Sequence, residues 1–292
     1  MELFADLKEI VRRDEPLSGH TWLGLGGRAT YFITPGTIEE LQTVVRRCRE
    51  NDVPMYVLGA GANLLVDDAG VKGAVIRLGQ GQFTEVARVE GGLRANAGTD
   101  MSRLVLRCVR QGLSGLECLT GIPGSVGGCV RMNAGGAFGD IGNVVESVEV
   151  MNENAEVFTR YRADLAFAYR STNIASKFIL GAELRLVEDD SQRILKQVKQ
   201  IWIYKKNTQP LGRRNAGCIF KNPRGISAGA LIDRAGLKGK RVGGAYVSEK
   251  HANFILADKG AKASDVLKLI NIIRETVYRK SEVYLELEIE VW

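Results

Sequence analysis

The chain has 292 residues, of which 45% are hydrophobic and 25% are charged, and its net charge at pH 7 is +6. This length is long for a single core and suits two or three lobes of a soluble globular protein. There is no run of about 18 apolar residues, which excludes membrane insertion, and the basic residues are scattered rather than gathered into the stripe typical of nucleic-acid binding.

The first 16 residues, MELFADLKEIVRRDEP, lack the apolar core of a signal peptide and predict a short helix. With only two histidines, the chain cannot form a His-rich metal site. The cysteines form no CxxC pair, and there are five of them: Cys48, Cys108, Cys118, Cys129 and Cys218. Scattered, odd-numbered thiols favour a reducing compartment, so we expect a cytoplasmic protein without a bound metal.

Residues 34–52 predict a helix, because Thr37 and Glu40 form a capping box before an apolar stripe. The elements expected next are strands at 53–59 and 72–78, a hairpin at 85–98, a helix at 100–111, and strands at 144–152, 156–162 and 178–187. A helix at about 190–205 then leads to the break at Gln209-Pro210, where the pattern changes.

Beyond that break we expect a helix at 227–236, a strand at 251–257, a helix capped by Ser264, and a strand that alternates over 281–292. The whole pattern predicts an α+β protein. A nucleotide- or cofactor-binding region is expected over residues 1–205, including the N-terminal helix, and a smaller lobe over residues 206–292.

Gly59, Gly61 and Asn63 lie in the segment GAGANLLV between two predicted strands. Glycines there allow a sharp turn and let backbone N–H groups approach a phosphate. The segment is not a Rossmann motif, because the third glycine is missing and a strand follows, and it is not a Walker A motif. On its own it is equally compatible with a tight turn and with a phosphate-binding loop.

The segment GIPGSVGG, residues 121–128, is more specific. Pro123 suits the first position of a helix, and the glycines with Ser125 would expose backbone donors where an anion is favoured. The glycine-rich segment MNAGG follows at 132–136. Two such segments are best explained by a long dinucleotide cofactor held between them.

Seven segments occur in the order found in the UDP-N-acetylenolpyruvoylglucosamine reductases, and the chain resembles this family from about residue 18 to 291. They are HTWLGLGGRATYF, VLGAGANLLVDDAGVKGAVI, GLECLTGIPGSVGGCVRMNAGG, FAYRSTNI, NAGCIFKNP, ALIDRAGLKGKRVGGAYVSEKHANFI and LELEIEV. The direct path from FAYRSTNI to the next strand resembles the shorter, second structural type of the family.

The resemblance implies a two-lobed FAD-binding domain of the vanillyl-alcohol-oxidase/PCMH type and a smaller C-terminal α+β substrate-binding domain. It implies reduction of UDP-N-acetyl-3-O-(1-carboxyvinyl)-glucosamine to UDP-N-acetylmuramate for peptidoglycan synthesis. Hydride passes from NADPH to noncovalent FAD and then from flavin N5 to the enolpyruvyl group, while an acid protonates the carbon next to the carboxylate. The expected partners are the UDP-sugar and NADPH, and we expect a monomer.

Three residues match the family's catalytic positions. Arg170 matches the arginine that stabilises the enolate, Cys218 occupies the place of the usual serine acid, and Glu288 matches the second glutamate of the LExEV strand. Without the resemblance, Arg170 would be read as part of a surface ion pair and Glu288 as one of a row of solvated glutamates. The resemblance implies substrate contacts from Tyr169, Lys221 and Asn222. It implies cofactor contacts from Gly59, Ala60, Gly61, Ala62, Asn63, Leu64, Gly121, Ile122, Pro123, Gly124, Ser125, Gly127, Gly128, Asn133, Ala134 and Gly135.

Cys218 lies in NAGCIFKNP beside Lys221 and Asn222. Its thiol could be a small buried filler, a nucleophile or a proton donor. Two other functions remain open from the sequence: a different FAD enzyme with the same cofactor lobes, and a nucleotide-sugar binding protein in which Cys218 marks lost catalysis. The C-terminal segments argue against a different FAD enzyme, because NAGCIFKNP and LELEIEV are not expected there.

Overall fold

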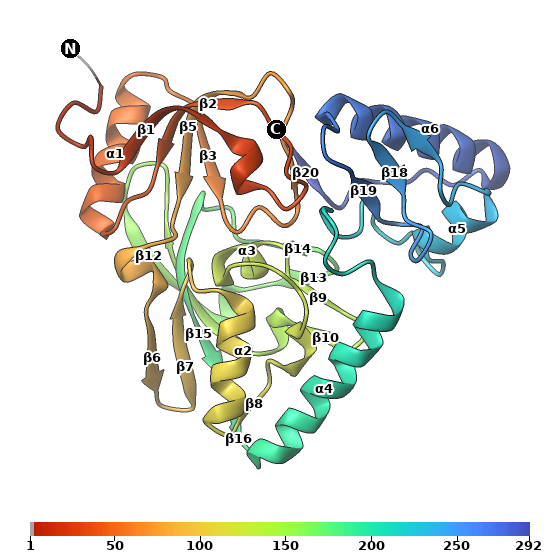
Figure 1. Cartoon of the computed structure of the whole chain (residues 1–292). Coiled ribbons are helices and arrows are strands. Elements are labelled where there is room, and N and C mark those ends of the chain that lie inside the picture. Colours follow the sequence, from red (N-terminus) through yellow and green to blue (C-terminus); the bar gives the residue numbers. More distant parts are fainter. Residues whose placement is uncertain (1–2) are drawn as a thin grey trace. The chain divides into compact units, whose positions relative to one another are not determined.

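The computed structural model describes residues 3–292, and the chain folds into two compact units (Figure 1). Unit 1 consists of Met1–Glu15, Thr30–Ala60 and Lys72–Tyr204, and unit 2 consists of Pro16–Ala29, Gly61–Val71 and Lys205–Trp292. Two stretches from the first quarter of the chain therefore pack with the C-terminal residues. The predicted functional boundary between residues 205 and 206 stays a prediction.

A four-stranded sheet lies in unit 1, with strand order β1-β2-β5-β3. Its members are β1 (Val11–Pro16), β2 (Arg28–Ile33), β5 (Val71–Arg77) and β3 (Met55–Leu58), and β3 runs parallel to β5. The apolar face of helix α1 (Ile38–Glu50) is buried in the same hydrophobic cluster as side chains of this sheet. The predicted capping box is confirmed, because the Thr37 hydroxyl accepts from Glu40 N at 3.2 Å and the Glu40 carboxylate accepts from Thr37 N at 3.3 Å.

A five-stranded antiparallel sheet forms the other part of unit 1, with order β12-β11-β15-β7-β6. The strands are β12 (Val157–Tyr161), β11 (Val145–Met151), β15 (Phe178–Arg185), β7 (Gly92–Asn96) and β6 (Val86–Val89). The predicted hairpin at 85–98 is confirmed as β6 and β7. Helix α2 (Met101–Arg110) begins at Asp100, whose carboxylate accepts from Arg103 N at 2.8 Å. The short helix α3 (Val126–Arg131) packs on β15 and β7.

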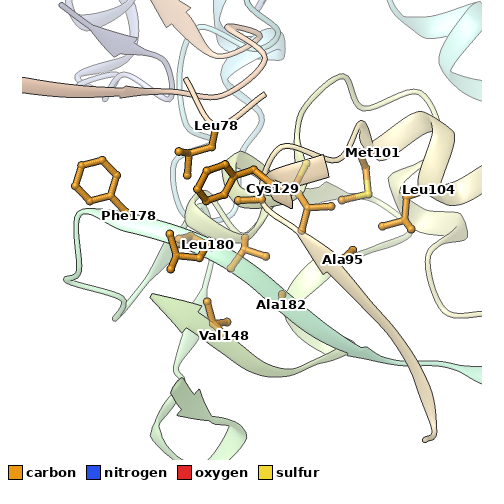
Figure 2. Close-up of a cluster of buried hydrophobic side chains, with 14 of the residues drawn as sticks. Leu78, Ala95, Met101, Leu104, Cys129, Val148, Phe178, Leu180 and Ala182 are labelled. Carbon is orange, nitrogen blue, oxygen red and sulfur yellow. The ribbon is translucent and has the colours of Figure 1, made fainter. Parts of the chain in front are cut away.

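The core of unit 1 joins the two sheets and their helices. Figure 2 shows Leu78, Ala95, Met101, Cys129 and Leu180 within one cluster of buried apolar side chains, contributed by strands, α2 and α3. Cys129 is 3% exposed in this cluster, so it behaves as a small hydrophobic residue.

One long helix, α4 (Ser191–Thr208), follows the last strand of unit 1, and several short elements complete the unit. The short strands are β8 (Leu113–Ser114), β9 (Gly135–Gly136), β10 (Gly139–Asp140), β13 (Phe167–Ala168), β14 (Ser171–Thr172) and β16 (Val187–Glu188). Single 3₁₀ turns of unit 1 lie at Gly81–Thr84, Glu117–Leu119, Ile141–Asn143 and Arg162–Asp164, and another at Leu17–His20 belongs to unit 2.

Unit 2 has its own buried core, formed around a small antiparallel sheet and two helices. The sheet consists of β17 (Arg241–Val242), β18 (Ala245–Val247) and β19 (Ile255–Ala257). Helix α6 (Ala263–Ser281) packs on β17, β18 and α5 (Ala228–Arg234). Strand β20 (Glu290–Val291) pairs in parallel with β4 (Leu64–Leu65), which joins the last residues of the chain to the first quarter.

Two predicted elements at the chain ends are wrong. The predicted N-terminal helix is replaced by turns up to residue 10 and then by β1, which pairs with β2, so pairing in the sheet overrides the local pattern; residues 1–2 lie outside the described part. The predicted strand at 281–292 is also wrong, because α6 continues to Ser281 and only Glu290–Val291 is a strand.

Two predicted helix starts also differ from the structure. Ser264 is not the cap of α6: its backbone N–H and that of Ala263 donate to the carboxylate of Asp68, at 3.0 and 2.7 Å. The N-cap is Lys262, whose N–H donates to the Asp265 carboxylate at 3.0 Å, and the distant Asp68 accepts from the next two N–H groups. Pro123 precedes α3 rather than opening it, and Ser125 is the N-cap.

Candidate functional site

The predicted site residues are divided between the two units. Unit 1 contains Gly59 and Ala60, the residues predicted between 121 and 135, and the pair Tyr169 and Arg170. Unit 2 contains residues 61–64 together with Cys218, Lys221, Asn222 and Glu288. The GAGAN segment thus contributes to both units, because the boundary falls between Ala60 and Gly61.

Gly59 lies close to the glycine-rich segment 121–128 in unit 1. A Cβ atom at Gly59 would lie 2.9 Å from the Ser125 hydroxyl oxygen and 3.9 Å from the Gly128 Cα atom. The same hydroxyl accepts from Gly128 N at 3.4 Å and caps α3. At Gly127 the restriction comes from the fold itself, since a Cβ there would lie 2.8 Å from the Ala97 Cβ atom. The structure therefore brings Gly59 of the GAGAN segment close to residues 121–128, one of the two segments predicted to hold a dinucleotide cofactor.

We expect Gly59→Val to lower FAD affinity by about tenfold or more. The new side chain would displace the Ser125 hydroxyl and take up space beside the segment expected to bind the cofactor, and a tenfold loss corresponds to about 1.4 kcal/mol of binding free energy. Flavin titration of the apoprotein measures the effect. Gly19→Ala is the matched control, because no atom lies within 4 Å of a Cβ built there. Unchanged FAD affinity in Gly59→Val would contradict a role for this contact.

Arg170 lies beside the glycine-rich segment MNAGG, residues 132–136. It occupies the turn between β13 and β14, which pair as Ala168 with Ser171, and its φ of 55° is left-handed. Its guanidinium donates to the carbonyl oxygen of Gly135 at 2.9 Å, and its Cζ atom lies 5.2 Å from the centre of the Tyr169 ring. The turn thus places a cation and a 52% exposed tyrosine next to the MNAGG segment.

Asn133 has a structural role in the same region. Its side chain is 3% exposed, donates to the Ala168 carbonyl oxygen at 2.9 Å and accepts from Gly142 N at 3.0 Å. Both amide atoms therefore bind protein backbone, and they hold the strand that leads to Arg170. The predicted cofactor contact of Asn133 stays a prediction for its backbone.

Sequence reasoning missed Arg131, which fastens the other side of the hairpin. Its guanidinium donates to the carbonyl oxygens of Ile174, Ser176 and Lys177, the last at 3.1 Å. Burial lowers the pKa of this arginine from its ordinary value. No local motif signals the contact, because its acceptors are backbone atoms more than 40 residues away.

In unit 2 the segment that carries Cys218 pairs on both of its sides. Cys218 forms a bridge with Phe254 on one side, and Phe220 forms a bridge with Leu287 on the other. Glu288 N donates to the Ile219 carbonyl oxygen at 2.8 Å. The two predicted catalytic residues of this unit therefore lie on directly paired segments.

Glu288 differs from the glutamates around it. It is half-buried, whereas Glu282, Glu286 and Glu290 are exposed. The Asn63 side chain donates to the Glu288 carbonyl oxygen at 3.0 Å, and Glu290 N donates to the Asn63 carbonyl oxygen at 2.9 Å. The end of the GAGAN segment therefore holds the Glu288 strand, although the two are far apart in the sequence.

Gly61 has a turn-forming role in the same segment. Its φ is +68°, and a Cβ atom there would overlap the carbonyl oxygen of His20. This close approach accompanies a hydrogen bond of 3.0 Å from Trp22 N to the Gly61 carbonyl oxygen. For Gly61, the tight-turn interpretation is therefore sufficient.

The predicted substrate residues Lys221 and Asn222 follow Cys218 directly. The Lys221 ammonium lies 3.7 Å from a carboxylate oxygen of Glu286. Asn222 accepts from Ala228 N at 3.0 Å and so anchors the start of α5. Both side chains have protein contacts, and their predicted contacts with substrate stay predictions.

The five cysteines differ in their burial, which predicts a pattern of alkylation at pH 8. Burial raises the pKa of Cys48 to about 11 and the pKa values of Cys108 and Cys129 to about 12. Because the thiolate is the reacting form, roughly one molecule in 10³ or fewer is reactive at these positions. Cys118 and Cys218 are half-buried.

We therefore expect iodoacetamide to modify Cys118 and Cys218 well before the other three cysteines. Peptide mass spectrometry over a time course measures the order of modification. The urea-unfolded protein is the control, in which all five positions are expected to react at similar rates. Early modification of Cys48 in the folded protein would contradict the burial described here.

A pocket of about 350 Å³ in unit 1 is lined by Glu117, Cys118, Phe138, Asp140 and others, none of which is a predicted site residue. It adjoins the predicted residues, because Asp140 pairs with Gly135. We do not assign the site to this pocket, because none of the residues predicted to carry the chemistry lines it. No helix within residues 3–292 is both long enough and apolar enough to span a membrane.

Comparison with family models identifies two regions. Residues 209–292 match the model described as UDP-N-acetylenolpyruvoylglucosamine reductase, C-terminal domain. Residues 29–160 match the model of an FAD binding domain.

Curated relatives match over nearly the whole chain. The UDP-N-acetylenolpyruvoylglucosamine reductase of Syntrophus aciditrophicus is 42% identical, with 95% of this chain and 90% of the relative covered. The enzyme of the same name from Carboxydothermus hydrogenoformans is also 42% identical, with 99% of this chain and 96% of the relative covered.

A solved structure gives the same result for the fold. The crystal structure of UDP-N-acetylenolpyruvylglucosamine reductase from Thermus caldophilus superposes with a TM-score of 0.85 at 42% identity, covering 97% of this chain and 98% of that chain. Together with the FAD-binding model, this match confirms the predicted α+β fold with its FAD-binding domain.

Proposed function

The chain belongs to the UDP-N-acetylenolpyruvoylglucosamine reductase family of FAD-containing oxidoreductases, and we propose how its residues carry out that reaction with NADPH as the hydride donor. The substrate is the enolpyruvyl ether of UDP-N-acetylglucosamine, and the product is UDP-N-acetylmuramate for peptidoglycan synthesis. The observation that carries the proposal for the residues is the pairing of the Cys218 segment with the Glu288 strand in unit 2.

The glycine-rich segments of unit 1 fit a cofactor with a diphosphate. Gly59 and Ser125 approach so closely that a Cβ atom at Gly59 would collide with the hydroxyl. Small residues in both segments let phosphate oxygens approach the backbone closely. The N–H groups of Ile122, Val126, Gly127 and Gly128 already donate within the protein, so the diphosphate is assigned to the other N–H groups. When bound, FAD supplies the hydride-transfer chemistry. We propose that Gly59 and residues 121–128 bind its diphosphate, and that the MNAGG backbone contacts it beside Arg170.

Charge on the substrate determines the roles of the three catalytic residues. Addition of hydride to the enolpyruvyl group builds negative charge on the carboxylate oxygens, which require cations or hydrogen-bond donors. The planar guanidinium of Arg170 suits these oxygens. We propose that the Cys218 thiol delivers the proton to the carbon next to the carboxylate, and that Glu288 acts in the same half-reaction.

The remaining assignments concern binding and location. We propose that Tyr169, Lys221 and Asn222 contact the UDP-sugar, with Lys221 close to its negative charge. The ion pair between Lys221 and Glu286 would then open when the UDP-sugar binds, because the Glu286 carboxylate and the substrate's negative charge compete for the Lys221 ammonium. We also propose that the enzyme acts as a monomer in the cytoplasm.

The visible absorption spectrum of the purified protein tests the function. We expect flavin absorption, FAD in the supernatant after denaturation, bleaching by NADPH, and recovery of the absorption when the enolpyruvyl UDP-sugar is added under anaerobic conditions. A protein that binds FAD and is bleached but does not recover with this substrate would indicate a different flavin enzyme. A protein that binds the UDP-sugar but shows no flavin chemistry after reconstitution would indicate a binding protein.

A further inference from the structure

One side of the Cys218–Phe220 segment is held by an amide side chain rather than by a second strand. The main chain of Asn253 begins the pairing, because its carbonyl oxygen accepts from Ile219 N at 2.8 Å. Its side chain continues it: the Oδ1 atom accepts from Phe220 N at 3.0 Å, and the Nδ2 atom donates to the Phe220 carbonyl oxygen at 2.8 Å. Asn253 thus satisfies both main-chain groups of Phe220.

The contact is buried and has no water-exposed alternative. Asn253 is 2% exposed and Phe220 is 0% exposed. Without the amide, the Phe220 N–H and C=O groups would be left inside the protein without these partners, which is unfavourable. The segment would then retain its pairing with the Glu288 strand and the main-chain bond from Ile219 N to Asn253, but it would lose both side-chain bonds that hold Phe220.

A second set of contacts holds Asn253 itself. Its backbone N–H donates to the Nδ1 atom of His251 at 3.3 Å, and His251 N in turn donates to the buried Ser248 hydroxyl at 3.3 Å. Burial lowers the pKa of His251, so the ring is neutral at pH 7 and its Nδ1 atom can accept. The ring of His251 also packs edge-on against Phe254, at 4.9 Å between centroids. These contacts hold the turn that presents Asn253.

We propose that Asn253 is a positioning residue for the reaction, because its side-chain amide fixes the segment that carries Cys218 and that pairs with the Glu288 strand. This inference rests on the proposed function, since it assigns the thiol and the carboxylate to one half-reaction. Asn253 does not contact the reacting atoms in this assignment. It determines where the thiol and the carboxylate lie, and a displacement of about 1 Å can cost up to about 10²-fold in rate.

The test compares two substitutions in the holoenzyme. Asn253→Ala removes both hydrogen bonds, and Asn253→Asp keeps the acceptor but loses the donor to the Phe220 carbonyl oxygen. For both at pH 8 we expect flavin reduction by NADPH within about twofold of wild type, and flavin reoxidation by the UDP-sugar slowed by about 10–10²-fold. Val266→Ala is the control, because it removes core volume from α6 in the same unit without removing a bond to the segment.

The pH dependence separates positioning from a general loss of structure. A buried aspartic acid binds its proton more tightly than usual, and once protonated it can donate to the Phe220 carbonyl oxygen as the amide did. The reoxidation rate of Asn253→Asp relative to Asn253→Ala is therefore expected to rise as the pH falls from 8 to 5.5. Groups far from residue 253 titrate alike in both variants, so their contribution cancels in this ratio.

A readout that does not depend on activity completes the test. Hydrogen exchange of the peptide covering residues 216–223 is expected to be faster in Asn253→Ala and unchanged in Val266→Ala. If exchange and reoxidation are both close to wild type, the inference is wrong. If exchange is faster but reoxidation is unaffected, the Asn253 side chain does hold the segment, and the assignment of Cys218 and Glu288 to the reaction is wrong. Equal slowing of reoxidation in Val266→Ala would show a general effect of stability and would also overturn the inference.

Discussion

Replacing Cys218 by alanine is expected to slow reoxidation of the reduced flavin by the UDP-sugar by about 10²–10⁴-fold, the usual contribution of a positioned acid. The step needs a protonated group, and a cysteine with an ordinary pKa of about 8.5 is mostly a thiol at pH 7. Flavin reduction by NADPH is expected to be unchanged, because no proton from Cys218 is used there. Stopped-flow absorbance of the two half-reactions measures both rates.

Cys218→Ser is the matched control, since a hydroxyl can also deliver a proton and is expected to retain activity. In the wild-type enzyme the rate is expected to fall as the pH rises through the ionisation of the thiol, because a thiolate has no proton to give. In Cys218→Ser this fall in rate should shift to higher pH or disappear. A reoxidation rate in Cys218→Ala equal to wild type would mean that the thiol only fills space.

Replacing Arg170 by methionine is expected to slow the same half-reaction by about 10²–10³-fold, the usual cost of removing one preorganised donor from a developing oxyanion. Its φ of 55° and its bond to the Gly135 carbonyl oxygen hold the guanidinium in place before substrate binds. Arg170→Lys is expected to recover only part of the loss, because an ammonium cannot form two parallel hydrogen bonds to a carboxylate.

Arg162→Met is the matched control for Arg170. The guanidinium of Arg162 packs over the ring of Phe167 in strand β13 of the same hairpin, 5.5 Å from its centre, and this arginine has no predicted role in the reaction. Stopped-flow traces of both variants give the comparison. Equal slowing in Arg162→Met, or a normal rate in Arg170→Met, would show that Arg170 is an ordinary surface residue.

Elements whose signals are local could be predicted from the sequence. The capping box of Thr37 and Glu40 marks the start of α1 because both partners lie within one turn. The hairpin at 85–98 follows from its alternation and from Gly91, whose φ is +74°. The start of α6 could be predicted only in part, because the N–H groups of Ala263 and Ser264 donate to the distant Asp68.

The candidate site divides in the same way. The glycine-rich segments are visible in the sequence because the residue type itself carries the information, and the structure places Gly59 beside Ser125. The residues that hold the site in place could not be identified from the sequence. Arg131 and Asn253 bind main-chain atoms more than 30 residues away, and any residue type could supply such atoms. The choice of Cys218 and Glu288 came from the family resemblance, and only the structure shows that their segments pair.

The pairing of β4 with β20 has a consequence for synthesis on the ribosome. Asn63 and Glu288 are 225 positions apart, and the hydrogen bond between them can form only when almost the whole chain has been made. Trp292 extends the ladder through bonds with Asp67 and Leu65. Unit 1 can acquire most of its core during translation, whereas the unit that carries Cys218 must wait until residues 288–292 have been made and must then close a very long loop. A stop codon placed before Glu288 should therefore yield chains whose N-terminal cofactor segments are made but whose acid is never brought into place.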